Sequence, residues 1–169
     1  VMKKVISASR RTDLVAFFPD WLSTVFKGKR AQVYGPTGHV YNVDLNPQAV
    51  HTIVLWSKDF SNLIANNFGL LEMLQKYSQL YLHFSVSGLG GTFVEQGVLA
   101  FNDALLQLKP LIKIVKNPER VSIRFDPVIF WEEQGKVLTN LHFFEKMAPQ
   151  LNSQGIKDIR FSFVQWYNK

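Results

Sequence analysis

The sequence has no cysteine. Its own residues therefore cannot form a disulfide, a thiolate zinc site or a protein-ligated iron–sulfur cluster. It also lacks a long hydrophobic run: Lys3 and Lys4 precede only a short apolar stretch, which is neither a signal peptide nor a membrane span. We therefore expect a cytoplasmic protein that has no membrane partner.

Acidic residues are fewer than basic ones: the chain has 13 Asp and Glu against 19 Lys and Arg, and its formal net charge is +6. The surplus is spread along the chain rather than gathered in a tail. It favours anionic partners, from acidic small molecules and nucleotides to nucleic acid, without selecting one of them. A solvated surface with no special partner has the same balance, because only a clustered basic face indicates nucleic-acid binding.

Five short β-prone runs alternate with four segments of helical spacing or composition. The runs are residues 4–8, 52–56, 80–86, 121–125 and 159–164. The helical segments are residues 20–26, 60–76, 98–115 and 141–152, and Pro110 should kink or break the third. We also expect a hairpin over residues 32–45, where Gly35, Pro36 and Gly38 separate two β-prone runs. Strands that alternate with helices predict parallel pairing, in a doubly wound sheet or in a barrel.

Side-chain alternation in three of the runs favours a barrel. Apolar and polar residues alternate in residues 80–87, 121–126 and 159–163. A doubly wound sheet is apolar on both faces, and an ordinary TIM barrel has an apolar interior, so one polar face predicts a wide or incomplete barrel. We therefore predict an α/β fold: a partial TIM-type (β/α) barrel of about five parallel strands with intervening helices and a small inserted hairpin, forming a single domain over residues 1–169. An open sheet with helices on one side and its polar face in water is the alternative.

Polar residues follow every predicted strand, at the edge where parallel β/α folds bind their ligands. We predict that a substrate or anion is bound by Ser9, Arg10, Arg11, Asp13, Trp56, Lys58, Ser85, Arg124 and Asp126. The four cationic side chains among them could together hold a phosphate or a carboxylate. Asp13 and Asp126 would then be structural partners of the arginines. In the structural alternative, the Arg–Asp pairs only tie the loops together.

Candidates for catalysis are few. His83, on the predicted inner face, and Asp126 could act as a general acid or base. The other histidines, at positions 39, 51 and 142, show no metal-ligand spacing, so we predict no metal site. Trp56 could stack on a planar ligand or simply fill the core. The glycines of residues 88–91 precede no helix with a phosphate-binding spacing, and they predict a mobile loop.

Three motifs resemble, in order along the chain, those of a bacterial family, the domain of unknown function 1848. They are Ile6-Ser7-Ala8-Ser9-Arg10-Arg11-Thr12-Asp13, Leu55-Trp56-Ser57-Lys58 and Glu119-Arg120-Val121-Ser122-Ile123-Arg124-Phe125-Asp126-Pro127. The second motif departs from the family's usual Phe-Trp-Thr-Lys. A further departure is Ser87-Gly88-Leu89, which stands where the family usually has Thr-Gly-Tyr.

The resemblance implies a longer full-length protein with a C-terminal cysteine cluster, similar to the one that holds the iron–sulfur centre of radical S-adenosylmethionine enzymes. On this interpretation the chain is a truncated N-terminal part without a cofactor of its own. S-adenosylmethionine and the iron–sulfur cluster are then implied only for a full-length relative. An unclosed barrel has an unpaired strand edge, which predicts that the chain forms a homodimer or aggregates.

Three functions remain open at this point. The first is the substrate-holding part of a radical-SAM-like barrel enzyme. The second is a nucleotide or nucleic-acid binding module without catalysis, which the positive charge and the side chains of Trp56 and Tyr81 favour. The third is an acid–base barrel enzyme that binds a phosphate ligand, although such enzymes usually hold phosphate with the loops after strands seven and eight.

Overall fold

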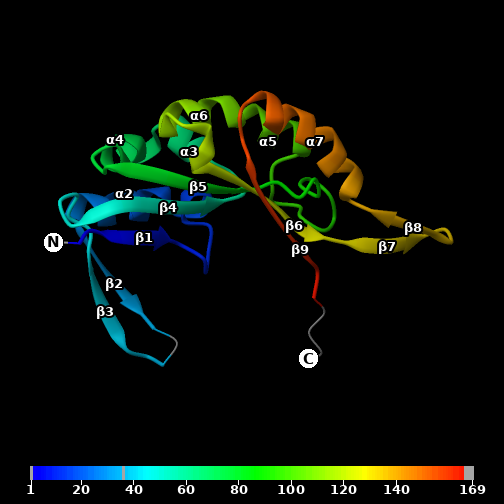
Figure 1. The fold of residues 1–169 in the computed structure, drawn as a ribbon. Helices are drawn as coiled ribbons and strands as arrows, with labels where there is room; N and C mark the ends of the chain where they lie inside the picture. The colour runs from blue at the N-terminus through cyan, green and yellow to red at the C-terminus, as the bar shows by residue number, and fades with distance from the viewer. Residues whose placement is uncertain (1, 36, 166–169) are drawn as a thin grey trace. The chain divides into compact units, whose positions relative to one another are not determined.

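The computed structural model describes residues 2–35 and 37–165 (Figure 1). Five strands form one parallel sheet in the order β1-β4-β5-β6-β9, and helices flank this sheet. The α/β class and the five strands predicted from the sequence are confirmed, whereas closure into a barrel remains a proposal. The chain divides into two compact units, Val1–Leu82 and His83–Lys169, which are described one at a time.

Unit 1 carries the first strands and helices of the alternation. Its elements are β1 (Lys4–Ala8), α1 (Leu14–Phe17), α2 (Pro19–Gly28), β2 (Arg30–Tyr34), β3 (Val40–Asp44), β4 (Val50–Ser57), α3 (Ser61–Ile64), η1 (Asn67–Gly69), α4 (Leu70–Leu74) and the first part of β5 (Gln79–Ser85). β1 lies parallel to β4, with Ile6 opposite Ile53 and Ala8 opposite Leu55. The carboxyl ends of these two strands therefore lie side by side.

The predicted hairpin is confirmed as β2 and β3. Its antiparallel pairs run from Arg30 opposite Asp44 to Tyr34 opposite Val40. The hairpin extends away from β1 and β4 (Figure 1), and Tyr34 and Tyr41 near its tip are exposed. Because a two-stranded ribbon is only marginally stable in water, contacts with the rest of unit 1 are needed to hold it.

Helix α2 packs an apolar side against the core of unit 1. Pro19 stands at its first position, where no intrahelical hydrogen bond is lost, and Leu22 and Phe26, four residues apart, are both buried. The ring of Phe26 meets that of Tyr77 edge to face, with 5.5 Å between centroids. The Tyr77 hydroxyl donates to the carbonyl of Leu45. Burial is the main cause that raises the pKa of Tyr77 to about 12.

The helix predicted over residues 60–76 is wrong in its length. Two short helices, α3 and α4, occupy this segment, with the 3-10 turn η1 between them. Left-handed φ angles at Asn66, Phe68 and Gly69 interrupt the helix. The Asn66 side-chain oxygen also accepts a hydrogen bond of 3.0 Å from the backbone N–H of Leu71 at the start of α4. An asparagine that bonds to nearby backbone in this way competes with continuation of the helix.

Unit 2 contains the rest of the sheet. Its elements are the end of β5, α5 (Phe101–Leu106), α6 (Leu108–Val115), η2 (Pro118–Arg120), β6 (Val121–Val128), β7 (Phe130–Glu133), β8 (Lys136–Thr139), α7 (Leu141–Ser153) and β9 (Asp158–Phe163). The break predicted for this segment is confirmed, but it lies three residues before Pro110: the helix ends at Leu106 and resumes at Leu108, and Pro110 is in the first turn of α6. Proline at position 110 lacks the N–H that would bond to the carbonyl of Leu106 in a continuous helix.

A second hairpin, β7–β8, is not among the elements predicted from the sequence. It turns at Gln134 and Gly135, both in the left-handed region with φ of 52° and 74°, as a type I′ turn requires. A glycine between two β-prone runs was the available signal. Among residues 2–35 and 37–165, no helix is long and apolar enough to cross a membrane.

Apolar and polar side chains alternate along β6 and β9 as predicted, but the apolar side chains of β6 are buried and those at the end of β9 are exposed. The strands are parallel, with Phe125 opposite Phe161. Phe125 is buried and meets Phe144 of α7 edge to face at 5.6 Å. In contrast, Phe161 and Phe163 of β9 are 65% and 59% exposed. The alternation therefore predicts which side chains share a face, and the neighbouring elements decide which of them are covered.

Candidate functional site

Asp13 is the structural centre of the strand ends in unit 1. Its Oδ1 accepts a 2.9 Å hydrogen bond from the Ala16 N–H and so caps α1. Its Oδ2 lies 2.8 Å from both the Ser57 hydroxyl and the backbone nitrogen of Lys58. The Ser57 hydroxyl has a single proton and also lies 2.7 Å from the Asp59 carbonyl, so it donates to one of these oxygens at a time. The carboxylate thereby ties the loop after β1 to the end of β4.

This arrangement corrects the expectation that Asp13 is the ionic partner of the neighbouring arginines. Neutral donors hold its carboxylate, and no carboxylate among the described residues forms an ion pair with Arg10 or Arg11. Both arginines are exposed. The end of β1 therefore carries two positive charges that are not neutralised by acidic residues in the part of the chain that the structure describes.

Arg10 and Arg11 are nevertheless held in place by neutral groups. The guanidinium carbon of Arg10 lies 5.4 Å from the centre of the Trp56 ring, a cation–π contact worth about 0.5–1 kcal/mol at an exposed site. The Trp56 indole N–H donates to the Ser7 hydroxyl at 2.7 Å. Arg11 donates from Nη1 to the Tyr34 carbonyl at 2.9 Å and so attaches the hairpin β2–β3 to the end of β1.

Two other predicted residues of unit 1 have backbone roles in the same loops. The Ser9 hydroxyl accepts a 3.0 Å hydrogen bond from the backbone N–H of Arg11, which fixes the turn between the two. Lys58 is partly buried directly after β4 and uses its backbone N–H to bond Asp13. The structure thus brings Arg10, Trp56, Asp13 and Lys58 to the adjoining ends of β1 and β4.

In unit 2, Arg124 and Asp126 form an ion pair on the polar face of β6. The Ser162 hydroxyl of β9 donates to the other carboxylate oxygen at 2.6 Å. The side chains of Arg124 and Asp126 are 30% and 24% exposed, respectively. The expected pairing of an arginine with an aspartate is confirmed for this pair, and Asp126 offsets much of the positive charge of Arg124. Ser162 was not predicted, although it lies on the polar face of β9.

His83 and Ser85 lie two residues apart on β5 and therefore share a face of that strand. His83 is buried and Ser85 is partly buried. Beyond them, the loop after β5 is closed by hydrogen bonds: the Ser87 hydroxyl donates to a Glu95 carboxylate oxygen at 2.5 Å, and the Gly91 N–H donates to the Glu95 carbonyl at 3.1 Å. Mobility of this loop remains a prediction.

Asn140, which sequence analysis missed, joins three segments of unit 2. It is fully buried just before α7. Its amide nitrogen donates to the carbonyls of Ser87 at 2.9 Å and Pro127 at 3.0 Å, and its oxygen accepts from the Ile129 N–H at 3.0 Å. An asparagine before a helix suggests a capping residue, but these three partners lie 11 to 53 positions away, beyond any local signal.

The predicted site residues are thus grouped within each unit. Unit 1 holds Ser9, Arg10, Arg11, Asp13, Trp56 and Lys58, and unit 2 holds His83, Ser85, Arg124 and Asp126. That all of the cationic side chains bind one anion remains a prediction. Among residues 2–35 and 37–165, no three His, Cys, Asp or Glu residues are grouped as a metal site requires.

No curated protein and no solved structure matches the chain. A family model, however, matches residues 5–169. This span includes the Arg10-Arg11-Thr12-Asp13 turn, the Trp56-Ser57-Lys58 strand end and the Arg124-Phe125-Asp126-Pro127 strand end on which the resemblance rests. The chain therefore belongs to the family described as a domain of unknown function, DUF1848.

Proposed function

We propose that the chain is the substrate-holding part of a radical-SAM-like barrel enzyme and that it binds an anionic small molecule at the carboxyl ends of its strands. The observation that carries the anion site is the pair of arginines after β1, whose charges meet only neutral groups among the described residues. The radical-enzyme part rests on what the resemblance to the family implies. In a fold of this class, ligands bind at this edge of the sheet. The polar face of β6 supports a barrel with a polar interior.

Arg10 is the residue whose side chain is best placed to bind an anion. The described residues accept no hydrogen bond from its side chain, and its contact with Trp56 uses the ring face. A guanidinium held in this way keeps its N–H donors for a carboxylate or phosphate, which it binds through two parallel hydrogen bonds. Trp56 is itself fixed by its hydrogen bond to Ser7, so little side-chain freedom remains to be lost when the ligand binds.

Arg11 and Lys58 would add positive charge to the same strand ends, while Asp13 would hold both loops without touching the ligand. In unit 2, Ser85, Arg124 and Asp126 would contact polar groups of a substrate, with His83 and Asp126 as candidates for proton transfer. The iron–sulfur cluster of a radical enzyme does not fit this chain, because the sequence has no cysteine to ligate it.

Calorimetric titration with inorganic pyrophosphate tests the anion site. We expect saturable binding to the unmodified chain and a loss of about 10- to 100-fold in Arg10→Ala, because a hydrogen bond to a charged group contributes about 1.5–3 kcal/mol. Arg30→Ala is the matched control, since Arg30 is also an exposed arginine of unit 1 but lies at the start of β2. Equal weakening in both variants would indicate general charge attraction and would contradict a site at Arg10.

The radical-enzyme part of the proposal has a separate test. A full-length relative with a cysteine cluster should gain the visible absorption of an iron–sulfur cluster when it is reconstituted with iron and sulfide. Absence of that absorption would remove the radical-SAM assignment. It would leave the anion site of this chain to be judged by the titration alone.

A nucleotide or nucleic-acid binding module is the second candidate. It is favoured by the exposed rings of Tyr34 and Tyr41 on the hairpin that Arg11 holds, because bases stack on aromatic side chains next to cationic ones. Phosphate contacts make such binding fall steeply with added salt. A single-stranded oligonucleotide that binds with this salt dependence, and that loses affinity in Tyr34→Ala, would favour the module. No binding at low salt would eliminate it.

A further inference from the structure

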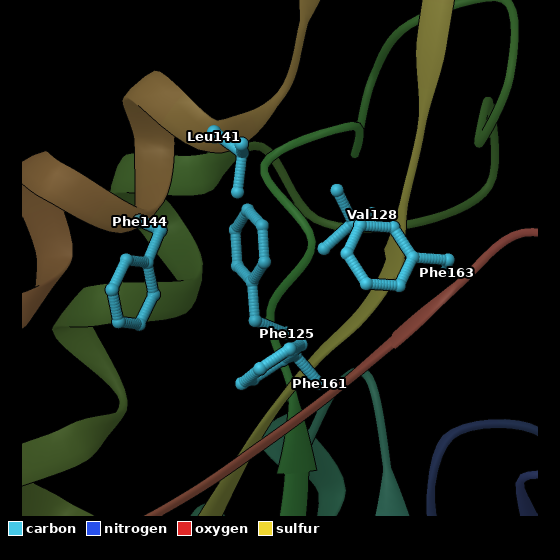
Figure 2. A pocket seen from close by; sticks show the side chains of 6 residues that line it. All are labelled: Phe125, Val128, Leu141, Phe144, Phe161 and Phe163. Carbon is cyan, nitrogen blue, oxygen red and sulfur yellow. The ribbon is translucent and has the colours of Figure 1, made fainter.

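The strand β9 presents an aromatic surface that no described element covers. Phe161 and Phe163 of β9 are 65% and 59% exposed, and Phe130 of β7, which is 51% exposed, stacks on Phe163 at 6.5 Å. Figure 2 shows Phe161 and Phe163 along β9, with Phe163 beside Val128 and with the Phe125 ring between Phe161 and Leu141 of α7. Six side chains line an open cavity of about 170 Å³, and all of them are apolar: Phe125, Val128, Leu141, Phe144, Phe161 and Phe163.

The free edge of the same strand has neither a lysine nor a proline to protect it against pairing, and its two charged residues, Asp158 and Arg160, pair with each other. β9 has a single strand neighbour, β6, among the described residues. Natural edge strands are commonly blunted by lysine, proline or a bulge. β1, at the other end of the strand order, begins with a lysine, Lys4. β9 contains neither lysine nor proline. The irregularity in its ladder with β6 lies between Phe125 and Val128, which pair with Phe161 and Phe163, so the extra residue is on β6 and not on β9. The β9 sequence Ile159-Arg160-Phe161-Ser162-Phe163 alternates apolar and polar residues, as a strand does.

From this edge and this surface we propose that β9 pairs with β9 of a second copy of the chain, antiparallel and centred on Phe161. An antiparallel pair places directly opposite residues on the same face. Centring on Phe161 sets the two Phe161 rings opposite each other and places Ile159 opposite Phe163 twice. All six apolar side chains then lie on one face of a sheet that continues through both copies.

The charges on β9 favour this register over its neighbours. Asp158 and Arg160 form an ion pair within the strand, with 3.2 Å between Nη2 and a carboxylate oxygen, so the edge carries no net charge against a second copy. Centring on Arg160 would set two arginines opposite each other, which is destabilising. Centring on Ile159 would set Lys157 against Phe161 of the partner. A shift by one residue would place apolar side chains opposite polar ones.

The area available suits a modest dimer. The exposed parts of Phe130, Phe161 and Phe163 amount to roughly 350 Å² per copy, since a phenylalanine presents about 150–250 Å². A standard interface buries about 800 Å² per partner. The aromatic rings therefore supply nearly half of it, and the paired strand edges and their surroundings must supply the rest. We accordingly expect a dimer at about 100 µM that dissociates on dilution.

The absence of cysteine makes the register testable by single-cysteine cross-linking. In Phe161→Cys the two thiols lie directly opposite, at the Cβ separation of about 5 Å found between paired strands, and mild oxidation should yield a disulfide-linked dimer. In the matched Phe163→Cys variant, which changes the same residue type on the same face, the two thiols lie four residues apart along the strand, about 13 Å, and should not cross-link.

Sedimentation of the unmodified chain gives an independent test. We expect about twice the 19.4 kDa mass of one chain at 100 µM, and loss of the dimer in Phe161→Arg. Leu106→Arg, which changes a residue of α5 that is 74% exposed, should remain dimeric. A monomer at every concentration would overturn the proposal. Equal cross-linking of the two cysteine variants would overturn the register, and growth beyond a dimer would show open-ended association instead of a closed pair.

Discussion

The buried amide of Asn140 gives the most sharply defined prediction about stability. Its side chain makes three hydrogen bonds, to the carbonyls of Ser87 and Pro127 and from the N–H of Ile129. At about 1 kcal/mol each, their loss in Asn140→Ala should lower the free energy of unfolding of the chain by about 3 kcal/mol. The cost arises because two carbonyls and one N–H lose their partner in the interior.

The isosteric variant Asn140→Asp separates hydrogen bonding from volume. Its ionised carboxylate would face two carbonyl oxygens without a counter-charge, so we expect a loss of about 4 kcal/mol at pH 7. Burial raises the pKa of a carboxyl group. Because the folded-state pKa lies above the unfolded value, the stability is present at low pH and is lost as the pH rises through the folded-state pKa. Near pH 4 the protonated acid can donate one hydrogen bond and accept another, which reduces the loss to about 1–2 kcal/mol.

Urea denaturation at pH 4 and pH 7 measures this difference, with the unmodified chain as reference at each pH. Amide hydrogen exchange adds a local measurement, since the N–H of Ile129 donates to the Asn140 oxygen and should lose protection first in Asn140→Ala. An Asn140→Asp variant with the same stability deficit at both pH values would refute the reasoning. Unchanged protection of the Ile129 N–H in Asn140→Ala would refute it as well.

Three further predictions concern stability. Asp13→Asn should destabilise the chain by about 2 kcal/mol in thermal unfolding, because the side-chain NH2 group of the asparagine would face an N–H or O–H donor that now bonds to the carboxylate. Unchanged stability would contradict the carboxylate's role in joining the two strand ends. Because the pKa of Tyr77 is raised to about 12 in the folded chain, its phenol contributes fully to the free energy of unfolding below pH 10. This contribution falls by at most about 3 kcal/mol as the pH rises from 10 to 12. Urea denaturation across this pH range should show the fall in the unmodified chain and not in Tyr77→Phe. Gly90→Ala should cost about 2–3 kcal/mol, because its Cβ would lie 1.8 Å from the Leu99 carbonyl oxygen, whereas Gly97→Ala, with no atom within 4 Å, should be nearly neutral.

The sequence predicts the sheet well because its information is local. Each of the five strands is a short β-prone run, and alternation of side chains identifies the two faces of β5 and β6. Helix ends are less visible. The interruption between α3 and α4 depends on left-handed backbone at Asn66 and Phe68, and phenylalanine is not a residue type that signals such a conformation.

The candidate site is predictable in its residues but not in their pairing. Sequence order places Arg10, Arg11 and Asp13 in one loop, which suggested an Arg–Asp pair. In the structure, the Asp13 carboxylate instead accepts hydrogen bonds from Ala16, Ser57 and Lys58, and the last two are more than 40 positions away in the sequence. Which donors reach this carboxylate depends on the register between β1 and β4, and that register cannot be predicted from the residue types alone. The same argument explains why Asn140 was missed.

The central claim is that the loops after β1 and β4 bind an anion, and chemical-shift mapping tests it most directly. Titrating isotope-labelled chain with inorganic pyrophosphate should move the backbone amide signals of residues 9–13 and 56–58 in a saturable way, and should move the indole N–H signal of Trp56. These shifts should be lost in Arg10→Ala and kept in Arg30→Ala. Shifts spread over exposed lysines throughout the chain, or none at these loops, would contradict the account.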